Sequence, residues 1–278
     1  MLSVSRTSTL LLTPLSTTLN KNFTSRLASP VFRLAGLLTL FLGWLLLSDV
    51  VGRQTIPGPI ATWEFIVREF ERGAMQRHLA ATFNRVVIAF LISMGLGIVV
   101  GALMGIYRRI DELLEAWVVA MLNIPRLVLF VAAYLILGLN DRAAILALII
   151  SVLPTVIVQV REGTRAVDNK LVEMAVAYRR SRLAIWRRVV LPQLMPYIIG
   201  TARTTLALAW KMVILAELMG RTSGVGYQIS FYYQMFNMPG ILAYGLVMMV
   251  ILAIIDIVIM GGLQRWAFRW RRPAARLA

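Results

Sequence analysis

Five ionisable side chains lie inside otherwise apolar stretches, and they are the chain's first candidates for function. They are Arg126, Arg203, Lys211, Glu217 and Asp256. A charge within a membrane-spanning helix is costly unless it is paired or hydrated. These residues therefore indicate either a positive lining for an anionic solute or ion pairs between helices. The pairs would join Arg203 or Lys211 to Asp256 or Glu217 of another helix, and the sequence leaves both interpretations open.

Residues for catalysis or cofactor binding are scarce. The chain has no cysteine and one histidine, which argues against disulfides, haem, iron–sulfur clusters and the usual zinc sites. No Gly-x-x-x-x-Gly-Lys-Ser/Thr sequence is present to cradle phosphates. No paired carboxylates and no Ser/His arrangement favour an enzyme. The sequence therefore predicts no catalytic residues, no metal and no cofactor.

The elements that position these charges are long apolar stretches. The chain is 59% hydrophobic and only 15% charged, with a mean hydropathy of +0.76, whereas soluble domains carry roughly a quarter charged residues. A helix needs about 20 mostly apolar residues to cross a bilayer. Six stretches of this kind predict an all-α, polytopic membrane protein with six transmembrane helices in a domain over residues 32–263. They are residues 32–51, 84–107, 114–139, 143–160, 194–218 and 241–263.

The basic residues indicate how the chain is oriented. The net charge is +16, but its arginines cluster beside the apolar stretches, as expected for contact with lipid headgroups rather than nucleic acid. They concentrate in the amino-terminal tail, the turn at 108–109, residues 161–188 and the carboxyl tail. The positive-inside rule then predicts a protein of the bacterial inner membrane with both termini on the cytoplasmic side. We expect a flexible tail over residues 1–31 and a basic tail over 264–278.

Two further patterns concern packing. Apolar residues recur at helical spacing in the segment 57–81, which predicts an amphipathic helix on the outer membrane interface. In the second apolar stretch Gly97, Gly101 and Gly105 recur every fourth residue. Such a small-residue face lets helices approach closely. It predicts tight packing within the bundle or across a dimer seam.

The segment 161–193 is the only sizeable polar segment on the predicted inner side. Two apolar stripes in it predict two short amphipathic helices, and we expect Pro192 to end the second. Its spacing resembles the EAA loop of ABC importer permeases. That loop has Glu-Ala-Ala, three residues, a glycine, nine residues, an isoleucine, one residue and Leu-Pro. The corresponding residues here are Glu173, Met174, Ala175, Arg179, Val189, Leu191 and Pro192.

Three of these positions depart from the family pattern. Met174 replaces an alanine, Val189 replaces the isoleucine and Arg179 replaces the glycine. The glycine permits a turn with positive φ, which arginine disfavours by roughly 1 kcal/mol or more. We therefore expect the turn to be displaced, or the two helices to run together.

The resemblance extends over residues 56–272 and is closest to the sulfonate, nitrate and taurine branch of these permeases. It rests on short motifs in the family's order. They include His78-Leu79 with Thr82 and Arg85, the glycine-rich helix, Ile124-Pro125, Ala209-Trp210, Glu217 and Gly224-Val225-Gly226. It implies a type I ABC importer permease-like bundle within the lipid bilayer, without ATPase activity of its own.

The resemblance also implies partners. A separate ABC ATPase subunit would grip the coupling loop 161–193 at Glu173, Met174, Ala175, Tyr178, Arg179, Leu191 and Pro192. An extracytoplasmic solute-binding protein would deliver a small anion or organic compound, and a second permease, either the same chain or a homologue, would complete the pathway. Two other functions remain open: an ion-coupled secondary transporter, and a non-transport membrane assembly protein.

Overall fold

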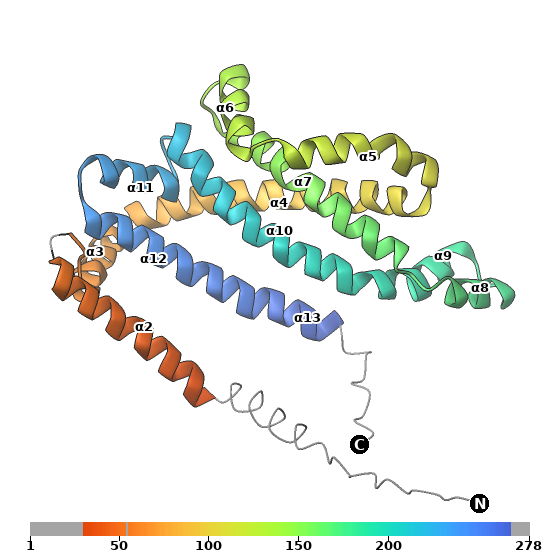
Figure 1. Ribbon diagram of the computed structural model, residues 1–278, viewed down its shortest axis with the longest axis horizontal. Coiled ribbons are helices and arrows are strands. Elements are labelled where there is room, and N and C mark those ends of the chain that lie inside the picture. Colours follow the sequence, from red (N-terminus) through yellow and green to blue (C-terminus); the bar gives the residue numbers. More distant parts are fainter. Residues whose placement is uncertain (1–29, 54, 268–278) are drawn as a thin grey trace, which may run out of the picture. The chain divides into compact units, whose positions relative to one another are not determined.

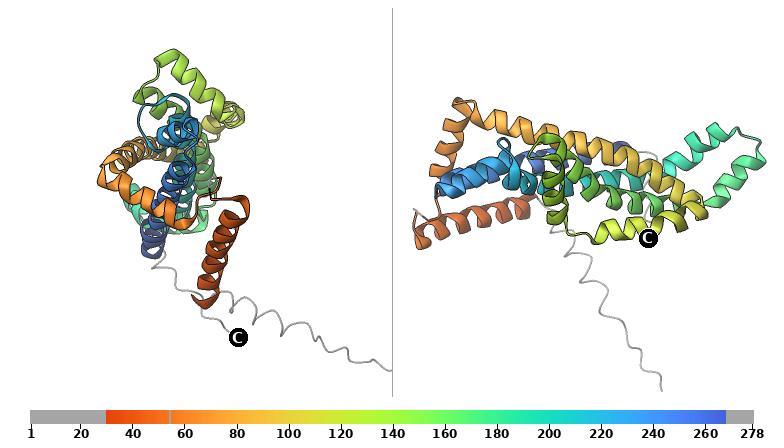
Figure 2. Two further views of the ribbon diagram at one scale, coloured as in Figure 1. Left: turned by 90° about the vertical axis from the view of Figure 1, so that its left-hand side faces the viewer. Right: turned by 90° about the horizontal axis from the view of Figure 1, so that it is seen from above.

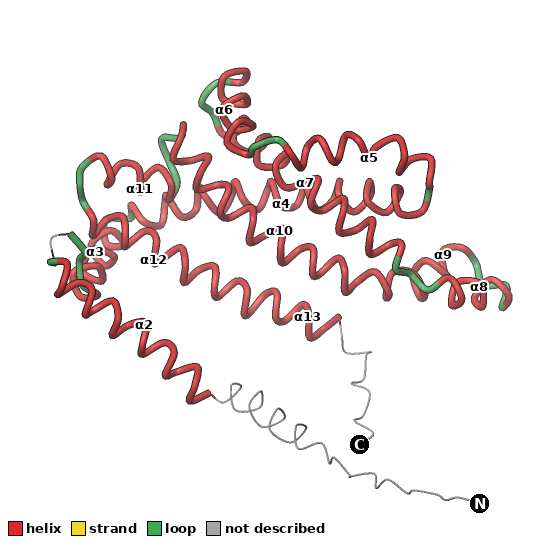
Figure 3. Tube along the Cα trace, viewed as in Figure 1, coloured by secondary structure: helices red, strands yellow, loops and turns green. Residues whose placement is uncertain are grey.

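The computed structural model describes residues 30–53 and 55–267 of the chain, and these are helical with no strand among them (Figure 3). The all-α prediction is confirmed. The chain divides into two compact units, Met1–Pro59 and Ile60–Ala278. Most of the predicted amino-terminal tail and of the carboxyl tail lies outside the described residues.

The first unit contains helix α2 (Pro30–Val51) and the turn that follows it. Trp44 Nε1 donates to the carbonyl of Pro57 at 3.1 Å, and Ser48 Oγ donates to that of Ile56 at 2.8 Å. These bonds fold the proline-containing segment back along the carboxyl-terminal end of α2.

The second unit begins with α3 (Pro59–Glu71) and α4 (Ala74–Ile106), which meet at Gly73. Gly73 has φ 69°, a left-handed conformation that glycine adopts without steric cost. The predicted outer segment 57–81 is therefore not one helix, and the second transmembrane helix begins ten residues before the expected Asn84. The sequence prediction placed the start at the first apolar run and missed the glycine turn.

The third predicted span is broken. Helices α5 (Arg108–Asn123) and α6 (Arg126–Leu137) meet at a bend of 93°. Ile124 is extended, as expected for a residue before proline. Helix α7 (Asp141–Arg165) follows and forms one continuous helix through Pro154.

The predicted coupling loop contains α8 (Asn169–Ala177), α9 (Arg182–Ile185) and the π-helix η1 (Trp186–Val190), and α10 (Leu191–Gly220) follows without a break. The expectation that Pro192 ends the helix is wrong. The N–H of Leu191 bonds to the carbonyl of Trp186, five residues earlier. This wider turn lets the helix continue past a residue that has no N–H to donate.

The described part of the chain ends in α11 (Val225–Gln234), α12 (Met238–Ile254), the π-helix η2 (Ile255–Met260) and α13 (Gly261–Ala267). Figures 1 and 2 show that the α8–α9 turn projects from the end of this unit opposite α11. Helices α4, α7 and α10 pack against one another, and their buried residues form most of the main apolar core, to which α6, α11 and α12 also contribute.

The glycine face of α4 packs inside the bundle. A Cβ at Gly101 would lie 2.6 Å from the carbonyl oxygen of Ile157 in α7, and Gly97 and Gly105 face Val156 and Thr164 of the same helix. Of the two interpretations left open by the sequence, the structure shows the intramolecular one for these glycines. The backbones of α4 and α7 approach so closely that no side chain fits between them.

Length and composition support four transmembrane spans among the described residues, and five if α5 and α6 count as one bent span. The four are Ala74–Ile106, Asp141–Arg165, Arg182–Gly220 and Met238–Leu263. The first predicted span falls on α2, whose apolar part Ala35–Val51 is shorter. All six predicted stretches are thus helical, but they differ in length and straightness.

Candidate functional site

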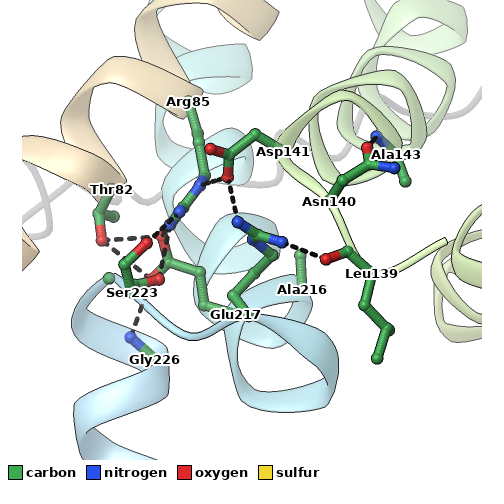
Figure 4. Close-up of polar contacts among 12 residues, drawn as sticks. Thr82, Arg85, Leu139, Asn140, Asp141, Ala143, Ala216, Glu217, Ser223 and Gly226 are labelled. Atoms are coloured by element: carbon green, nitrogen blue, oxygen red, sulfur yellow. Dashed lines mark hydrogen bonds and ion pairs between the residues drawn. The ribbon is translucent and has the colours of Figure 1, made fainter.

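A buried ion pair joins α4 to the end of α10. Arg85 Nη1 lies 2.5 Å from Glu217 Oε1, and the two side chains are 3% and 0% exposed. The Glu217 carboxylate also accepts hydrogen bonds from the Thr82 hydroxyl and the Gly226 N–H, each at 2.9 Å. Thr82 is one helical turn before Arg85, so one face of α4 supplies two of the three donors. We call Thr82, Arg85, Asp141, Glu217, Arg221 and Ser223 the Arg85–Glu217 cluster (Figure 4).

Asp141 at the start of α7 completes the cluster. Its Oδ1 atom lies 2.7 Å from Arg85 Nε and 2.8 Å from Arg221 Nη2. Arg85 also donates to the Ser223 carbonyl at 2.8 Å. The Asp141 carboxylate is at a helix N-terminus, where the helix dipole favours negative charge. The cluster therefore ties α4, α7, α10 and the segment before α11 together.

Gly224 and His78 shape the loop that covers this carboxylate. Gly224 has φ 114°, and a Cβ there would collide with the Glu217 carboxyl group. Its N–H donates to His78 Nδ1 at 3.1 Å, while His78 Nε2 lies 2.7 Å from the amide nitrogen of Gln228. The buried Oε1 atom of Gln228 has no hydrogen-bond partner within the part of the chain that the structure describes. Turning the Gln228 amide by 180° lets a neutral His78 donate from Nε2, so the imidazole bridges α4 to α11.

A second buried carboxylate anchors α3. Glu69 is 5% exposed and accepts a hydrogen bond from the Tyr244 hydroxyl of α12 at 2.9 Å. Burial and the neighbouring Glu69 carboxylate raise the pKa of Tyr232 in α11 to about 12. Helix α3 is thus fixed to α12 through a buried polar contact rather than by apolar packing alone.

Arg203 and Asp256 form a separate pair between α10 and η2. Their two hydrogen bonds measure 2.6 and 2.5 Å, and the side chains are 46% and 42% exposed. Lys211, two turns along α10, is exposed and makes no ion pair or hydrogen bond with the described residues. Arg126 begins α6 and makes no salt bridge with the described residues. The five intramembrane charges therefore form no single site, although Arg203, Lys211 and Asp256 border one hollow between α10 and the α12–η2 segment.

The predicted coupling residues lie together in and around α8 and η1. Arg179 has φ 49°. Its N–H bonds to the carbonyl of Val176 at 2.8 Å, and the N–H of Arg180 bonds to that of Ala175 at 3.2 Å. This is the Schellman arrangement that closes a helix on a left-handed residue. The expectation of a displaced turn is wrong, because arginine adopts the conformation that glycine would adopt.

One ion-pair cluster near the segment 161–193 was not predicted from the sequence motifs. Asp111, at the start of α5, is 7% exposed and binds the guanidinium groups of Arg161, at 3.1 Å, and Arg165. The signal available in the sequence is the pair of arginines four residues apart, which share one face of α7. The contact joins the turn between α4 and α5 to the end of α7 that leads into α8.

Among residues 30–53 and 55–267, no group of three or more His, Cys, Asp or Glu side chains is placed to hold a metal ion.

Comparisons with known proteins agree with this arrangement. Residues 93–272 match the family described as binding-protein-dependent transport system inner membrane component. A probable ABC transporter permease protein of Brucella melitensis is 31% identical over 72% of this chain and 80% of its own length. The putative aliphatic sulfonates transport permease protein SsuC of Bacillus subtilis is 30% identical over 65% of each chain. The nitrate import permease protein NrtB of Synechococcus elongatus is 25% identical over 86% of this chain and 89% of its own.

The fold has solved counterparts. A chain of the MetNI methionine ABC transporter, in an inward-facing conformation, superimposes with a TM-score of 0.58 at 19% identity. The match covers 66% of this chain and 93% of that one. At this identity the likeness concerns the fold, and it confirms the predicted permease-like bundle. The chain belongs to the binding-protein-dependent transport system inner membrane component family and is a multi-pass permease subunit of an ABC importer.

Proposed function

We propose that this permease is driven by a separate ATPase subunit that binds the segment 161–193, and that it imports a small anion. The observation that carries the first part is the turn at Arg179. It closes α8 at the position where the related loops have glycine, so the shape of the coupling segment is kept despite the substitution. A left-handed arginine costs roughly 1 to 2 kcal/mol. Maintaining the shape at that cost supports a docking role for the turn.

The segment is built to transmit force into the membrane domain. The Asp168 side chain caps α8 by accepting from the Lys170 N–H, and the Asp168 N–H donates to Gln193 Oε1 at 2.9 Å. The start of α8 is thereby fixed to the start of α10. Because α9, η1 and α10 form one continuous helix, a push on the turn displaces α10 as a rigid element.

The exposed surface of the segment indicates the chemistry of its partner. Met174 and Tyr178 are 53% and 74% exposed. Five arginines of the segment are also exposed, and two of them, Arg180 and Arg188, border the same hollow as Met174 and Tyr178; the five are Arg179, Arg180, Arg182, Arg187 and Arg188. A partner surface with an apolar centre and an acidic rim complements this pattern.

The same reasoning extends to the other partners and to the solute. Sulfonates and nitrate are named for two related permeases and are anions, and the exposed α10 face of this chain carries Arg203 and Lys211. In this proposal an extracytoplasmic binding protein delivers the anion, and a second permease copy or homologue supplies the other half of the pathway. Both termini lie in the cytoplasm, as the arginine distribution predicts.

A matched pair of tyrosine variants tests the coupling proposal. Tyr178→Ala should weaken binding of the ATPase subunit about 30-fold and so reduce its co-purification, because truncating an aromatic anchor at an interface costs about 2 kcal/mol. Tyr107→Ala, at the turn between α4 and α5, removes an aromatic side chain that is 54% exposed and should leave the yield unchanged. Equal yields from both variants would contradict the proposal, as would a wild-type chain that purifies without an ATPase.

A further inference from the structure

The bent helix pair α5–α6 connects the same two ends of the second unit as the continuous helix α10. One end carries the α8–α9 turn, and we call it the coupling end; the other carries the Arg85–Glu217 cluster, and we call it the cluster end. Figure 1 shows α5 running from the coupling end toward α6, and the two helices meet at a bend of 93°. The unit therefore has two links between its ends, one straight and one jointed.

A buried carboxylate fixes α5 at the coupling end. Asp111 Oδ1 lies 3.1 Å from Arg161 Nη1, and the other Asp111 oxygen binds Arg165. Glu115, one turn along α5, lies 3.6 Å from the same Arg161 nitrogen. Both arginines are near the end of α7, and α8 begins at Asn169, soon after α7 ends. A displacement of α8 therefore reaches α5 through the Asp111 carboxylate.

The end of α10 holds α6 at the cluster end. The Tyr134 hydroxyl donates to the Ala216 carbonyl at 2.8 Å, and Tyr134 is only 7% exposed. Arg221 donates to the carbonyl of Leu139, just past α6, at 2.6 Å and pairs with Asp141 of the cluster. Helix α6 is thus attached to the ends of α10 and α7 that the cluster joins.

The joint between the two helices lies at the surface. Asn123, Ile124 and Pro125 are exposed. Within the described chain their hydrogen bonds stay inside α5 and α6, such as those from Asn123 Nδ2 to the Val119 carbonyl and from the Val128 N–H to the Pro125 carbonyl. No hydrogen bond to a third helix among the described residues therefore fixes the bend angle.

Both arms are short, so a small change in this angle has a large effect. At about 1.5 Å per residue, Asp111 lies about 18 Å from the end of α5, and Tyr134 lies about 12 Å from the start of α6. Opening the bend by about 20° would move these two residues apart by about 3 Å. Hydrogen bonds tolerate only a few tenths of an ångström, so the end of α10 must move with α6 rather than slip past it.

We propose that α5–α6 is a jointed strut that carries movement of the α8–α9 turn to the cluster end, and that Asp111 positions it. The inference rests on the proposed docking of an ATPase and deepens it, because it assigns a second route for the movement beside α10. A buried ion pair is often no more stabilising than apolar packing, since lost hydration offsets the attraction, but it holds one geometry. Asp111 keeps one end of the strut fixed to α7, and Tyr134 keeps the other end fixed to α10.

The absence of cysteine from the sequence allows single fluorescent labels to follow the two ends of this route. Leu135→Cys lies on α6 and Leu171→Cys on α8, where the replaced side chains are 80% and 42% exposed. Each cysteine would carry a bimane label, whose emission depends on its surroundings, in the assembled complex with the ATPase in lipid nanodiscs. ATP with vanadate should change the emission of both labels.

Asp111→Asn should separate the two responses. The Leu171→Cys response should remain, because the docking turn is intact, whereas the Leu135→Cys response should fall about 5-fold, within the range by which single substitutions change coupling between distant sites. Tyr134→Phe should have the same effect, and the double variant should be no worse than the weaker single one, because both changes interrupt one link. Gly101→Ala, which is strained against α7 but leaves both attachments in place, controls for lost stability and should keep both responses.

A Leu135→Cys label that does not respond to ATP in the otherwise unmodified chain would overturn the strut. So would a Leu135→Cys response that Asp111→Asn leaves unchanged, or an equal loss at both labels, which would indicate a general structural effect. A Leu171→Cys label that is silent in the otherwise unmodified chain would instead contradict the docking of the ATPase, and with it the proposed function.

Discussion

Replacing Glu217 by alanine tests whether the Arg85–Glu217 cluster holds the membrane domain together. The Glu217 side chain is fully buried and accepts from Arg85 at 2.5 Å and from Thr82 and Gly226 at 2.9 Å each. The variant removes the acceptor for all three donors and leaves a guanidinium group that is 3% exposed without its nearest counter-ion.

The expected loss of stability depends on the interactions that Arg85 keeps in the Glu217→Ala variant. Removing one partner of a buried ion pair costs about 3 to 5 kcal/mol. Arg85 keeps Asp141 at 2.7 Å and the Ser223 carbonyl at 2.8 Å, so we expect a loss near the lower end, about 3 kcal/mol. Glu217→Gln still offers an acceptor to the Gly226 N–H and should lose about half as much, because the charge alone is removed.

The assay measures the free energy of unfolding in mild detergent. Circular dichroism monitors the loss of helix while sodium dodecyl sulfate is titrated in. Glu112→Gln is the matched control, because it removes an exposed i,i+4 pair with Arg108 that should contribute less than about 0.5 kcal/mol. A double-mutant cycle with Arg85→Met should give a coupling energy of about 2 kcal/mol. A loss below about 1 kcal/mol for Glu217→Ala would refute this account of the cluster.

Three further substitutions probe separate contacts. Arg179→Gly should raise the free energy of unfolding by about 1 kcal/mol, since glycine adopts the left-handed turn without strain; thermal unfolding measures this, and a lower midpoint would contradict it. Asp111→Asn should lower stability by about 2 kcal/mol in detergent titration, because two arginines of α7 lose their shared carboxylate; an unchanged value would show that the contact contributes nothing. Gly101→Ala should cost about 2 kcal/mol through its clash with α7, whereas Gly95→Ala, which faces open space, should be neutral or gain about 0.5 kcal/mol. Equal effects at the two glycines would contradict the packing of α4.

The spans could be predicted from sequence because hydropathy reports burial in lipid directly. Their boundaries could not, since Gly73 sets the start of α4 through a backbone turn that leaves no trace in hydropathy. Pro192 misled the prediction for a related reason. A proline indicates a missing donor, but only the structure shows that the π-helical turn at Trp186 accommodates the loss.

The charged residues, too, could be identified from the sequence, but most of their partners could not. The sequence identified Glu217 and Arg203 as intramembrane charges that need partners. It proposed the Arg203–Asp256 pair as one option, and the structure shows that contact. It did not assign Arg85 to Glu217, because the two are 132 positions apart and Arg85 lay at the edge of an expected span. Partners so distant in sequence are set by helix packing, which spacing along one chain does not encode.

The most direct test of the central claim is ATP-driven import by the purified complex in proteoliposomes. The complex would contain this permease, its ATPase subunit and the binding protein, and labelled nitrate and ethanesulfonate would be supplied on the binding-protein side. We predict uptake of at least one of these anions that requires ATP inside, stops with vanadate and is lost in Tyr178→Ala. Uptake that continues with vanadate or follows an ion gradient, or a complex that carries no ATPase, would contradict the account.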